Sequence, residues 1–542
     1  LFIFLISAAL YLAAAGVLVF KLGIVTNQAL AVVANASYVL FSRDPHLAAI
    51  GFVTSPLPSA AVLPLLPFKS LWPALTEQAL AAPIVSAFFM AGAVYQLYRL
   101  LRASWLSAPA AAVITGLFAI HPLIVFAAAT GRGEAAYLFF LLLAARHLLT
   151  WFRNGDLMGG VIAGFALAGA YLARYDAVLV GIAAIATVFL LSLSLPRLRR
   201  RVGEGAVSTA LCDAFIVGGP LVATIVLWGL SAWLVTGRVF PQLASGYGFP
   251  SQLQTLQAHL ATLGLANLFK PQRIILQLVS LEPALPAALL VFALAAFSRR
   301  SRAWVSVTAV LGLALGAIAT ASLLGNALPW LSISVLVVPV VTLVLPLGLA
   351  TPKSPSPRLG AKARGGGFVI ATLMLFAAIP TTMAAMLSPT AAPEESAILR
   401  PLLHEPAPSN GSAAQVAINV AQYIDRQHYA EGTVLVDSLT GFPVILASRS
   451  PQQFVIPSDR DFALALSAPK AFRVEYLLVP APASMNYLGS VDAINRAYPH
   501  LFDLGPASGE LIHEFTGSGR HVLWRLYAVS AVEAPSTISS QR

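Results

Sequence analysis

The sequence predicts an all-α polytopic membrane bundle with a C-terminal α/β domain outside the membrane. Three observations predict this fold class. The 542-residue chain is 58% hydrophobic and only 10% charged, whereas soluble domains carry roughly 25% charged residues. Apolar runs of about 20 residues, long enough to cross a bilayer core as helices, recur up to residue 387. After residue 388 the composition becomes that of a soluble protein.

About eleven apolar runs qualify as membrane helices by length and composition. We place them at approximately 1–20, 80–101, 106–124, 134–151, 157–173, 176–195, 208–235, 274–297, 303–323, 329–350 and 367–387. The first run is longer than a signal-peptide core and is followed by Lys21, so we expect a membrane helix there, with a cleaved signal sequence as the alternative. Because the chain opens without Met, we expect its natural start to lie upstream.

Basic residues gather in every second connection between these helices. They are Arg99 and Arg102, Arg146 and Arg153, and the stretches at 196–201, 298–302 and 353–364. Cytoplasmic loops carry an excess of Lys and Arg, so we place this side in the cytoplasm. The segments at 21–79, 122–133, 172–176, 236–273 and 324–328 then face outward. The net charge of +11 therefore orients a membrane protein and does not form a face for nucleic acid.

The region after the last membrane helix is expected to be a linker at 388–412 and an α/β domain at 413–542. A helix is predicted in "SAAQVAINVAQYIDRQ". Strand-like runs follow in "GTVLVDS", "FPVILAS", "QFVIP", "VEYLLVPAP", "GELIHEF" and "HVLWRLYAV". The odd number of preceding helices places this domain outside, where we assign it to acceptor binding or support.

The first outward loop places Asp44 between short apolar segments that are broken by prolines. "NQALAVVANASYVLF", "PHLAAIGFV" and "PSAAVLPLLPF" are typical of helices lying along a membrane surface. A carboxylate held at the lipid–water boundary suits group transfer from a lipid-linked donor. Such a reaction needs a base for the acceptor hydroxyl and cations for the departing phosphate.

Other outward turns supply further candidates for both roles. They are Arg132 and Glu134 in "ATGRGEAAY", Arg174 and Asp176 in "YLARYDAV", and Arg238 and Tyr247 in "TGRVFPQLASGYGFP". Ionisable residues at the ends of membrane helices are costly and are functional candidates by default. Their recurrence on one side says more than any single motif.

At these residues the chain resembles the GT-C glycosyltransferases. The closest branch depends on dolichyl- or undecaprenyl-phosphate sugars and includes protein O-mannosyltransferases and the aminoarabinose transferase of lipid A. "RDPHLAAIGF" stands where that group has its acidic helix, "TSPLPS" where it has a His-Pro-Pro-Leu-like run, and "GRGEAAYLFFLLLA" resembles its second acidic loop. The resemblance covers the membrane part, about 70% of the chain.

This resemblance implies that Asp44 is the catalytic base and that Glu134 is a second acid at the acceptor or donor site. It implies donor-phosphate binding by Arg132, Arg174, Arg238, His46 and Tyr247, with Asp176 on the acceptor side or in support. The chain departs from the family where Pro45 follows Asp44 in place of a second acid, and where Ser55 replaces a proline. The turn "GNALPWLSIS" also lacks the Arg-Tyr of relatives. No metal is assigned, and a divalent ion is left open.

Each candidate also has a purely structural interpretation. Asp44 before Pro45 is a good helix N-cap arrangement, and His46 is a neutral surface histidine or a partner that orients Asp44. Glu134 at a helix start would favour the positive end of the helix dipole. Arg132 would bind lipid head groups nonspecifically.

The remaining candidates have structural interpretations as well. Arg174 and Asp176 would pair within their turn, and Arg238 and Tyr247 would belong to a mobile cover. His121, which ends a helix before a proline, is expected to be structural. Among the short motifs, a Walker loop, HExxH, Cys/His ligand spacing and GxSxG are all absent from the sequence.

The sequence therefore favours a plasma-membrane glycosyltransferase that uses a polyprenyl-phosphate sugar and a hydroxyl acceptor in the cell envelope. Its partners would be these two substrates and membrane lipids, without nucleic acid. A transporter or translocase of lipid-linked sugars is the rival class, and it predicts internal repeats and charges near the bilayer midplane. A transferase-like subunit without activity is the third alternative.

Overall fold

The computed structural model describes most of the chain, in twelve segments. These are residues 1–104, 106–194, 205–262, 271–296, 302–323, 335–349, 357–389, 391–400, 410–482, 491–505, 509–517 and 521–529. The predicted basic stretch at 196–201, most of that at 298–302 and the turn at 324–328 lie outside these residues. The chain forms two compact units, 1–22 with 83–231 and 267–405, and 23–82 with 232–266 and 406–542.

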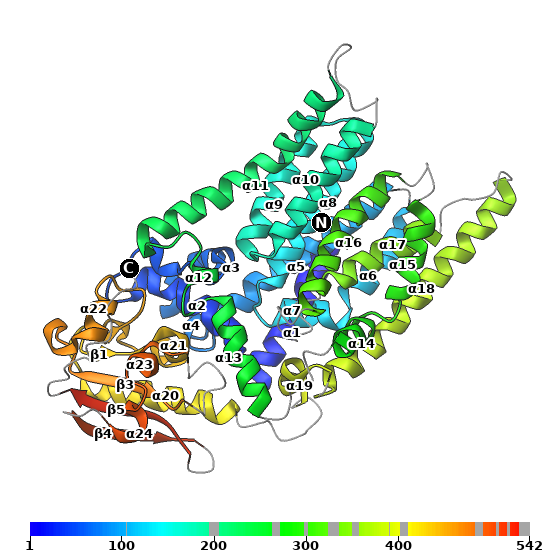
Figure 1. Ribbon diagram of the computed structural model, residues 1–542. Helices are drawn as coiled ribbons and strands as arrows, with labels where there is room; N and C mark the ends of the chain where they lie inside the picture. Colours follow the sequence, from blue (N-terminus) through cyan, green and yellow to red (C-terminus); the bar gives the residue numbers. More distant parts are fainter. Residues whose placement is uncertain are drawn as a thin grey trace. The chain divides into compact units, whose positions relative to one another are not determined.

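The first unit is a bundle of helices (Figure 1). Its helices are α1 (Phe2–Gly16), α5 (Ala81–Ser104), α6 (Ala108–Ala119), α7 (Pro122–Ala129), α8 (Glu134–Asn154), α9 (Leu157–Ala173), α10 (Ala177–Ser194), α11 (Ala206–Thr236), α14 (Pro271–Leu281), α15 (Leu285–Ala296), α16 (Arg302–Leu323), α17 (Val337–Leu349), α18 (Pro357–Leu387) and α19 (Pro393–Leu399). Every predicted membrane segment overlaps at least one described helix, and the chain is a multi-pass membrane protein with the predicted helical bundle.

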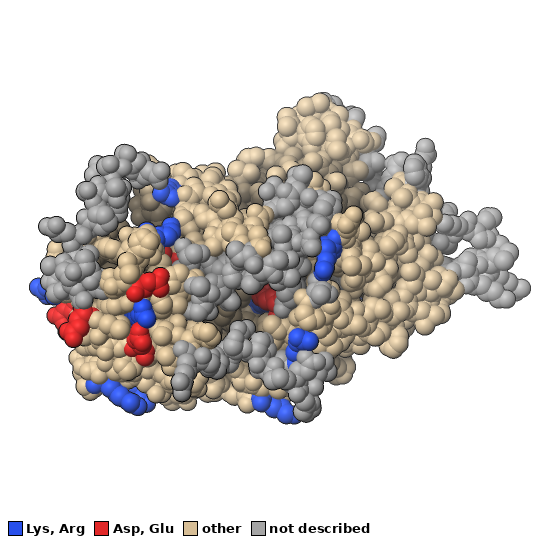
Figure 2. Space-filling model, turned by 60° about the horizontal axis from the view of Figure 1, so that its bottom comes forward, with Lys and Arg blue, Asp and Glu red and all other residues tan. Residues whose placement is uncertain are grey.

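Six of the described helices are long and apolar enough to cross a membrane, or seven if the bent pair of α6 and α7 is one span. Shorter apolar helices include α9, α15 and α17. The predicted segment at 274–297 is two helices, α14 and α15, separated at Glu282. Charged side chains are sparse on the face shown in Figure 2, as the low charge content predicts.

The second unit contains the first outward loop together with the C-terminal region. The loop forms α2 (Asn27–Phe41), the 3₁₀ helices η2 (Leu47–Ile50) and η3 (Leu63–Ser70), and the short helices α3 (Pro56–Val62) and α4 (Ala74–Glu77). These helices correspond to the apolar segments expected there. The helices α12 (Pro241–Ala244) and α13 (Phe249–Thr262) also belong to this unit.

The C-terminal region is the predicted mixed α/β fold, with a five-stranded sheet in the order β2-β1-β3-β5-β4. The strands are β1 (Val434–Leu435), β2 (Phe454–Val455), β3 (Tyr476–Pro480), β4 (Gly509–Thr516) and β5 (Val522–Val529). Strand β1 pairs parallel with β2 and β3, whereas β5 pairs antiparallel with β3 and β4. The helices are α20 (Asn410–Gln427), α21 (Ser438–Ala447), α22 (Phe462–Ser467), α23 (Ala493–Ala497) and α24 (Leu501–Leu504), with 3₁₀ turns η9 (Pro451–Gln453) and η10 (Pro469–Phe472).

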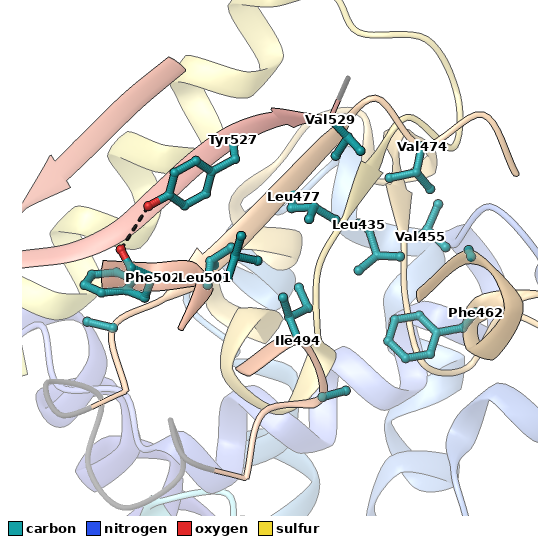
Figure 3. Packing of buried hydrophobic residues seen from close by; sticks show 14 residues of the cluster. Leu435, Val455, Phe462, Val474, Leu477, Ile494, Leu501, Phe502, Tyr527 and Val529 are labelled. Atoms are coloured by element: carbon teal, nitrogen blue, oxygen red, sulfur yellow. Dashed lines mark hydrogen bonds between the residues drawn. The ribbon is translucent and has the colours of Figure 1, made fainter. Parts of the chain in front are cut away.

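The apolar core of this region packs the sheet against its helices (Figure 3). Leu435, Leu477 and Val529 come from three neighbouring strands and meet Ile494 of α23. The Tyr527 hydroxyl donates to a carbonyl oxygen, that of Phe502, at 2.9 Å, which satisfies the polar end of a buried ring.

One strand prediction was wrong. "FPVILAS" lies in helix α21, where the Asp437 side chain caps the helix by accepting from the Leu439 N–H at 2.8 Å. Gly441, Val444 and Ile445 are buried at helical spacing. The cap and this packing outweigh the β propensity of the run.

Candidate functional site

The first group of candidate residues surrounds the start of helix α8 in the first unit. Helix α7 ends at Ala129, and Gly131 then takes a left-handed conformation with φ of +71°. A side chain is strained there, so glycine allows the chain to reverse sharply. The reversal places Arg132 in the turn and Glu134 in the first turn of α8, and both residues are buried.

Arg174 connects the ends of helices α8, α9 and α10. Its Nε and Nη2 donate to the two carboxylate oxygens of Asp176 at 3.1 and 2.7 Å, which is a bidentate pair. Its Nη1 lies 3.6 Å from Oε1 of Glu134, and the guanidinium group lies 5.0 Å from the centroid of the Tyr137 ring. The local pairing of Arg174 with Asp176 is confirmed, and the same arginine also holds Glu134.

Arg132 is the most enclosed of the predicted cations, with 2% of its surface exposed. Its Nη2 donates to Oε1 of Glu394 at 2.5 Å, and the group lies 5.1 Å from the ring centroid of Phe126. Within the described part of the chain, its Nε and Nη1 have no hydrogen-bond partner. A buried donor without a partner is costly, so these two nitrogens are donors that a further acceptor would satisfy.

Electrostatics keep both arginines charged. Burial alone lowers the pKa of Arg132, but the carboxylates of Glu394 and Glu134 outweigh it and the pKa is raised. Burial likewise opposes the charge on Arg174, and Asp176 and Glu134 more than compensate, so its pKa is raised as well. A permanent cation in a water-poor site is a strong partner for a phosphate group.

Sequence reasoning missed Glu394. It lies in the first turn of α19, within the Pro- and Ala-rich stretch that was assigned to the linker. Two consecutive acids after a proline, shortly after the last membrane helix, were a usable signal, since such acids favour a helix start. The pairing of His121 with Glu282 was also missed.

Asp44 belongs to the second unit. There Arg43 and Asp44 form ion pairs with acidic and basic residues of the C-terminal region. Arg43 pairs with Asp459 through Nε and Oδ2 at 3.1 Å and also with Asp461 through Nη2. Oδ2 of Asp44 lies 3.7 Å from Nε of Arg460 and accepts from the Arg460 backbone N–H at 3.5 Å. The charges of Arg43 and Asp44 are therefore complementary to those of the Asp-Arg-Asp run at 459–461.

The alternative in which Asp44 caps a helix is wrong. The following helix, η2, is a 3₁₀ turn that begins at Leu47, and its N-cap residue is His46 with no side-chain cap bond. Nδ1 of His46 instead lies 2.7 Å from the carbonyl oxygen of Asp44 and 3.9 Å from its Oδ1. The Asp44 side chain stays 30% exposed, so the carboxylate is accessible to solvent.

Asp459 is the buried end of this charge pattern. Its side chain is inaccessible to solvent, and Oδ2 accepts from the Ile456 backbone N–H at 3.2 Å. Burial raises the pKa of Asp459 to about 6, while the Ile456 N–H and Arg43 act in the opposite direction. Helix α22 begins directly after Asp461, without a side-chain cap.

Tyr247 and Arg238 lie in the segment 236–273, which the sequence places outside the membrane. The Tyr247 hydroxyl donates to Oδ2 of Asp437 at 2.9 Å, and the Arg496 guanidinium lies 4.8 Å from its ring centroid. Arg238 is exposed, and its Nη1 donates to the carbonyl oxygen of Ala244. Tyr247 thus anchors the loop within the second unit, whereas Arg238 binds its own turn.

Asp437 lies close to a second buried acid. Both Asp437 and Asp492 are fully buried and cap helices α21 and α23. Burial and the neighbouring Asp437 charge raise the pKa of Asp492 to about 8. The pair therefore retains one proton at neutral pH, which avoids two buried charges.

The structure brings together Arg132, Glu134, Arg174 and Asp176 in the first unit. In the second unit it brings Asp44 beside His46, while Arg238 and Tyr247 share a loop. No group of three or more His, Cys, Asp and Glu side chains that could hold a metal ion occurs among the described residues.

No protein-family model and no curated protein matches this sequence. Among solved structures, ArnT from Cupriavidus metallidurans bound to undecaprenyl phosphate is similar over 98% of this chain and 99% of its own, with 12% identity and a TM-score of 0.50. The oligosaccharyltransferase AglB from Archaeoglobus fulgidus, in complex with an inhibitory peptide and a dolichol-phosphate, is similar over 88% of this chain and 69% of its own, with 13% identity and a TM-score of 0.46. The near-complete overlap with ArnT confirms that this chain has the GT-C-like fold that the sequence resemblance implied.

Proposed function

We propose that this protein transfers a sugar from a polyprenyl-phosphate carrier to a hydroxyl group of a protein, glycan or lipid on the outer face of the plasma membrane. The observation that carries the proposal is Arg132, a buried guanidinium group with two nitrogens that bind no described residue. The fold similarity to ArnT, whose structure contains undecaprenyl phosphate, makes the phosphate of such a carrier the anion of choice.

The reaction assigns a separate role to each group. The Asp44 carboxylate accepts the proton of the acceptor hydroxyl, whose oxygen then bonds to the anomeric carbon of the sugar. The bond from that carbon to the phosphate oxygen breaks, and the carrier leaves as polyprenyl phosphate. Arg132 stabilises the charge that develops on this phosphate.

Glu134 and Arg174 support this chemistry. Arg174 is held by Asp176 and in turn orients Glu134, which acts at the acceptor or donor site. Arg238, Tyr247 and His46 are secondary candidates for donor binding. The proposed organisation is a membrane domain at 1–387, a linker at 388–412 and an extracytoplasmic domain at 413–542 that binds or supports the acceptor.

Binding of undecaprenyl phosphate tests the phosphate role without knowledge of the sugar. Wild-type protein in nanodiscs is expected to bind it, and Arg132→Gln is expected to weaken binding by roughly tenfold to a hundredfold, since charge-assisted hydrogen bonds to a phosphate are lost. Arg99→Gln, which changes an exposed arginine of the same unit, is the matched control. Equal binding by Arg132→Gln and wild type would refute the assignment.

Transfer tests the role of Asp44. Membranes containing wild-type or Asp44→Asn protein would receive undecaprenyl-phosphate-linked mannose or aminoarabinose, each carrying a radiolabel in the sugar. We expect labelled product from wild type and a loss of about 100-fold or more in Asp44→Asn, because general-base catalysis contributes that much. Asp503→Asn, an exposed aspartate of the same unit, should retain transfer. Undiminished transfer by Asp44→Asn would refute the role of Asp44 as base and leave it only a structural role as partner of Arg460.

A further inference from the structure

A second buried polar cluster lies in the first unit, and the proposed reaction does not use it. His121 occupies the break between helices α6 and α7, which are bent by 63° there. Glu282 lies between α14 and α15, and Thr382 lies near the C-terminal end of α18. Their exposed fractions are 3%, 0% and 0%.

The contacts within this cluster are incomplete. Nε2 of His121 lies 3.8 Å from Oε2 of Glu282 and 3.4 Å from Oγ1 of Thr382. Within the described part of the chain, neither oxygen of Glu282 nor Nδ1 of His121 has a hydrogen-bond partner of ordinary geometry. The backbone N–H of Ala284 also faces the carboxyl group of Glu282.

This cluster is stable in an apolar interior only if the Glu282 carboxyl group and the His121 imidazole share a proton. An ionised carboxylate without a partner in an apolar interior is costly. One proton between a carboxyl group and an imidazole removes that cost, either as a neutral pair or as an ion pair. A small rotation of either side chain would bring the 3.8 Å separation to the hydrogen-bond distance of about 3 Å.

The cluster lies near the start of the two chain segments that lead to Arg132 and to Glu394. Helix α7 starts directly after His121 and ends three residues before Arg132. Helix α18 carries Thr382 and leads into α19, whose first turn carries Glu394. Helices α6 and α7 both pack on α18, and so do α14 and α19.

We propose that His121 and Glu282 share one proton and act as positioning residues for Arg132, by holding the α6–α7 break against the α14–α15 turn and α18. This proposal depends on the proposed function in one respect, namely that the ligand of Arg132 is the phosphate group of the carrier. Within the described residues, each member of the pair is the other's ion-pair partner. Charged groups on the elements packed around them include Arg273 of α14, Arg132 and Glu134 after α7, and Glu394 and Glu395 of α19. Helix α18 carries Arg358, Lys362 and Arg364 in its N-terminal turns, whereas Thr382 lies near its C-terminal end.

Infrared difference spectra of the protein in nanodiscs, recorded between acidic and alkaline pH, test the shared proton. We expect a carbonyl band of a buried protonated carboxyl group that Glu282→Gln removes. His121→Asn should shift the titration midpoint of this band by about one pH unit or more, because a proton partner is lost. Glu77→Gln, an exposed glutamate, should leave the band intact. A band that persists in Glu282→Gln, or that ignores His121→Asn, would overturn the proposal.

Hydrogen exchange tests the positioning role without any substrate. Opening of the segments 122–137 and 391–400 is expected to become roughly tenfold more frequent in Glu282→Gln and in His121→Asn. The double variant should show no further change, because the two residues act as one pair. Unchanged exchange, or additive effects of the two substitutions, would contradict the proposal.

Undecaprenyl phosphate binding separates this inference from the proposed function. If wild type binds it, both variants should bind roughly tenfold more weakly and with an altered pH profile. If wild type does not bind it, the proposed function fails, while the infrared and exchange results still decide the role of the pair.

Discussion

Arg43 provides the counter-charge for Asp459. The structure predicts how the loss of stability caused by removing Arg43 depends on pH. Arg43→Gln keeps a polar side chain but leaves the inaccessible Asp459 carboxylate with the Ile456 N–H as its other hydrogen-bond donor. Breaking a buried ion pair by removing one partner costs about 3–5 kcal/mol. Because Arg43 is 19% exposed and the Ile456 N–H remains, we expect about 2 kcal/mol at pH 7.5.

The pH dependence follows from the pKa of Asp459. Burial raises it to about 6, above its value of about 4 in an unfolded chain. The folded unit therefore binds more protons than the unfolded chain between these values, and its stability falls as pH rises through this window. Arg43→Gln raises the pKa further, so at pH 5 the carboxyl group is largely protonated and the loss should shrink to about 1 kcal/mol or less.

Hydrogen exchange of the peptides 35–50 and 454–466 measures this local stability. The opening free energy, corrected for intrinsic rates, would be compared at pH 7.5 and pH 5 for wild type and Arg43→Gln. Arg449→Gln, an exposed arginine of the same unit, should change neither value. An equal loss at both pH values, or no loss at pH 7.5, would refute the assigned role of Asp459 and Arg43.

Three further substitutions test other parts of the structure. Arg174→Lys cannot make the bidentate pair with Asp176, and we expect a loss of about 1 kcal/mol, seen as a lower melting temperature. Asp492→Asn should stabilise the protein at pH 9 and change little at pH 6, because the pKa of Asp492 is raised to about 8 and its ionisation beside Asp437 costs stability as pH rises; equal melting curves at both pH values would contradict this. Gly131→Ala places a side chain at φ of +71°, which costs about 1–2 kcal/mol, and an unchanged melting temperature would show that the turn relaxes.

The sequence predicted the helical bundle because each membrane helix is marked by its own length and composition. It also singled out Glu134, Arg174 and Asp176, which the structure brings together, since charges at the ends of apolar helices stand out locally. The pairing of Arg43 with Asp459 was beyond reach, because the partners are 416 positions apart. A salt bridge at that separation leaves no periodic or local pattern.

Two other features show why local patterns fail. "FPVILAS" has the composition of a strand, but the Asp437 cap and burial at helical spacing make it a helix. Glu394 lies in a stretch with the composition of a linker, so only the position of Arg132 reveals its importance. A local cap and burial decided the first case, and a contact between distant segments decided the second.

A structure of the protein with bound undecaprenyl phosphate would test the central claim most directly. We predict phosphate density within hydrogen-bond distance of Nε and Nη1 of Arg132, on the side that Glu394 leaves open. Phosphate density bound by other residues, with Arg132 still paired to Glu394 alone, would contradict the account.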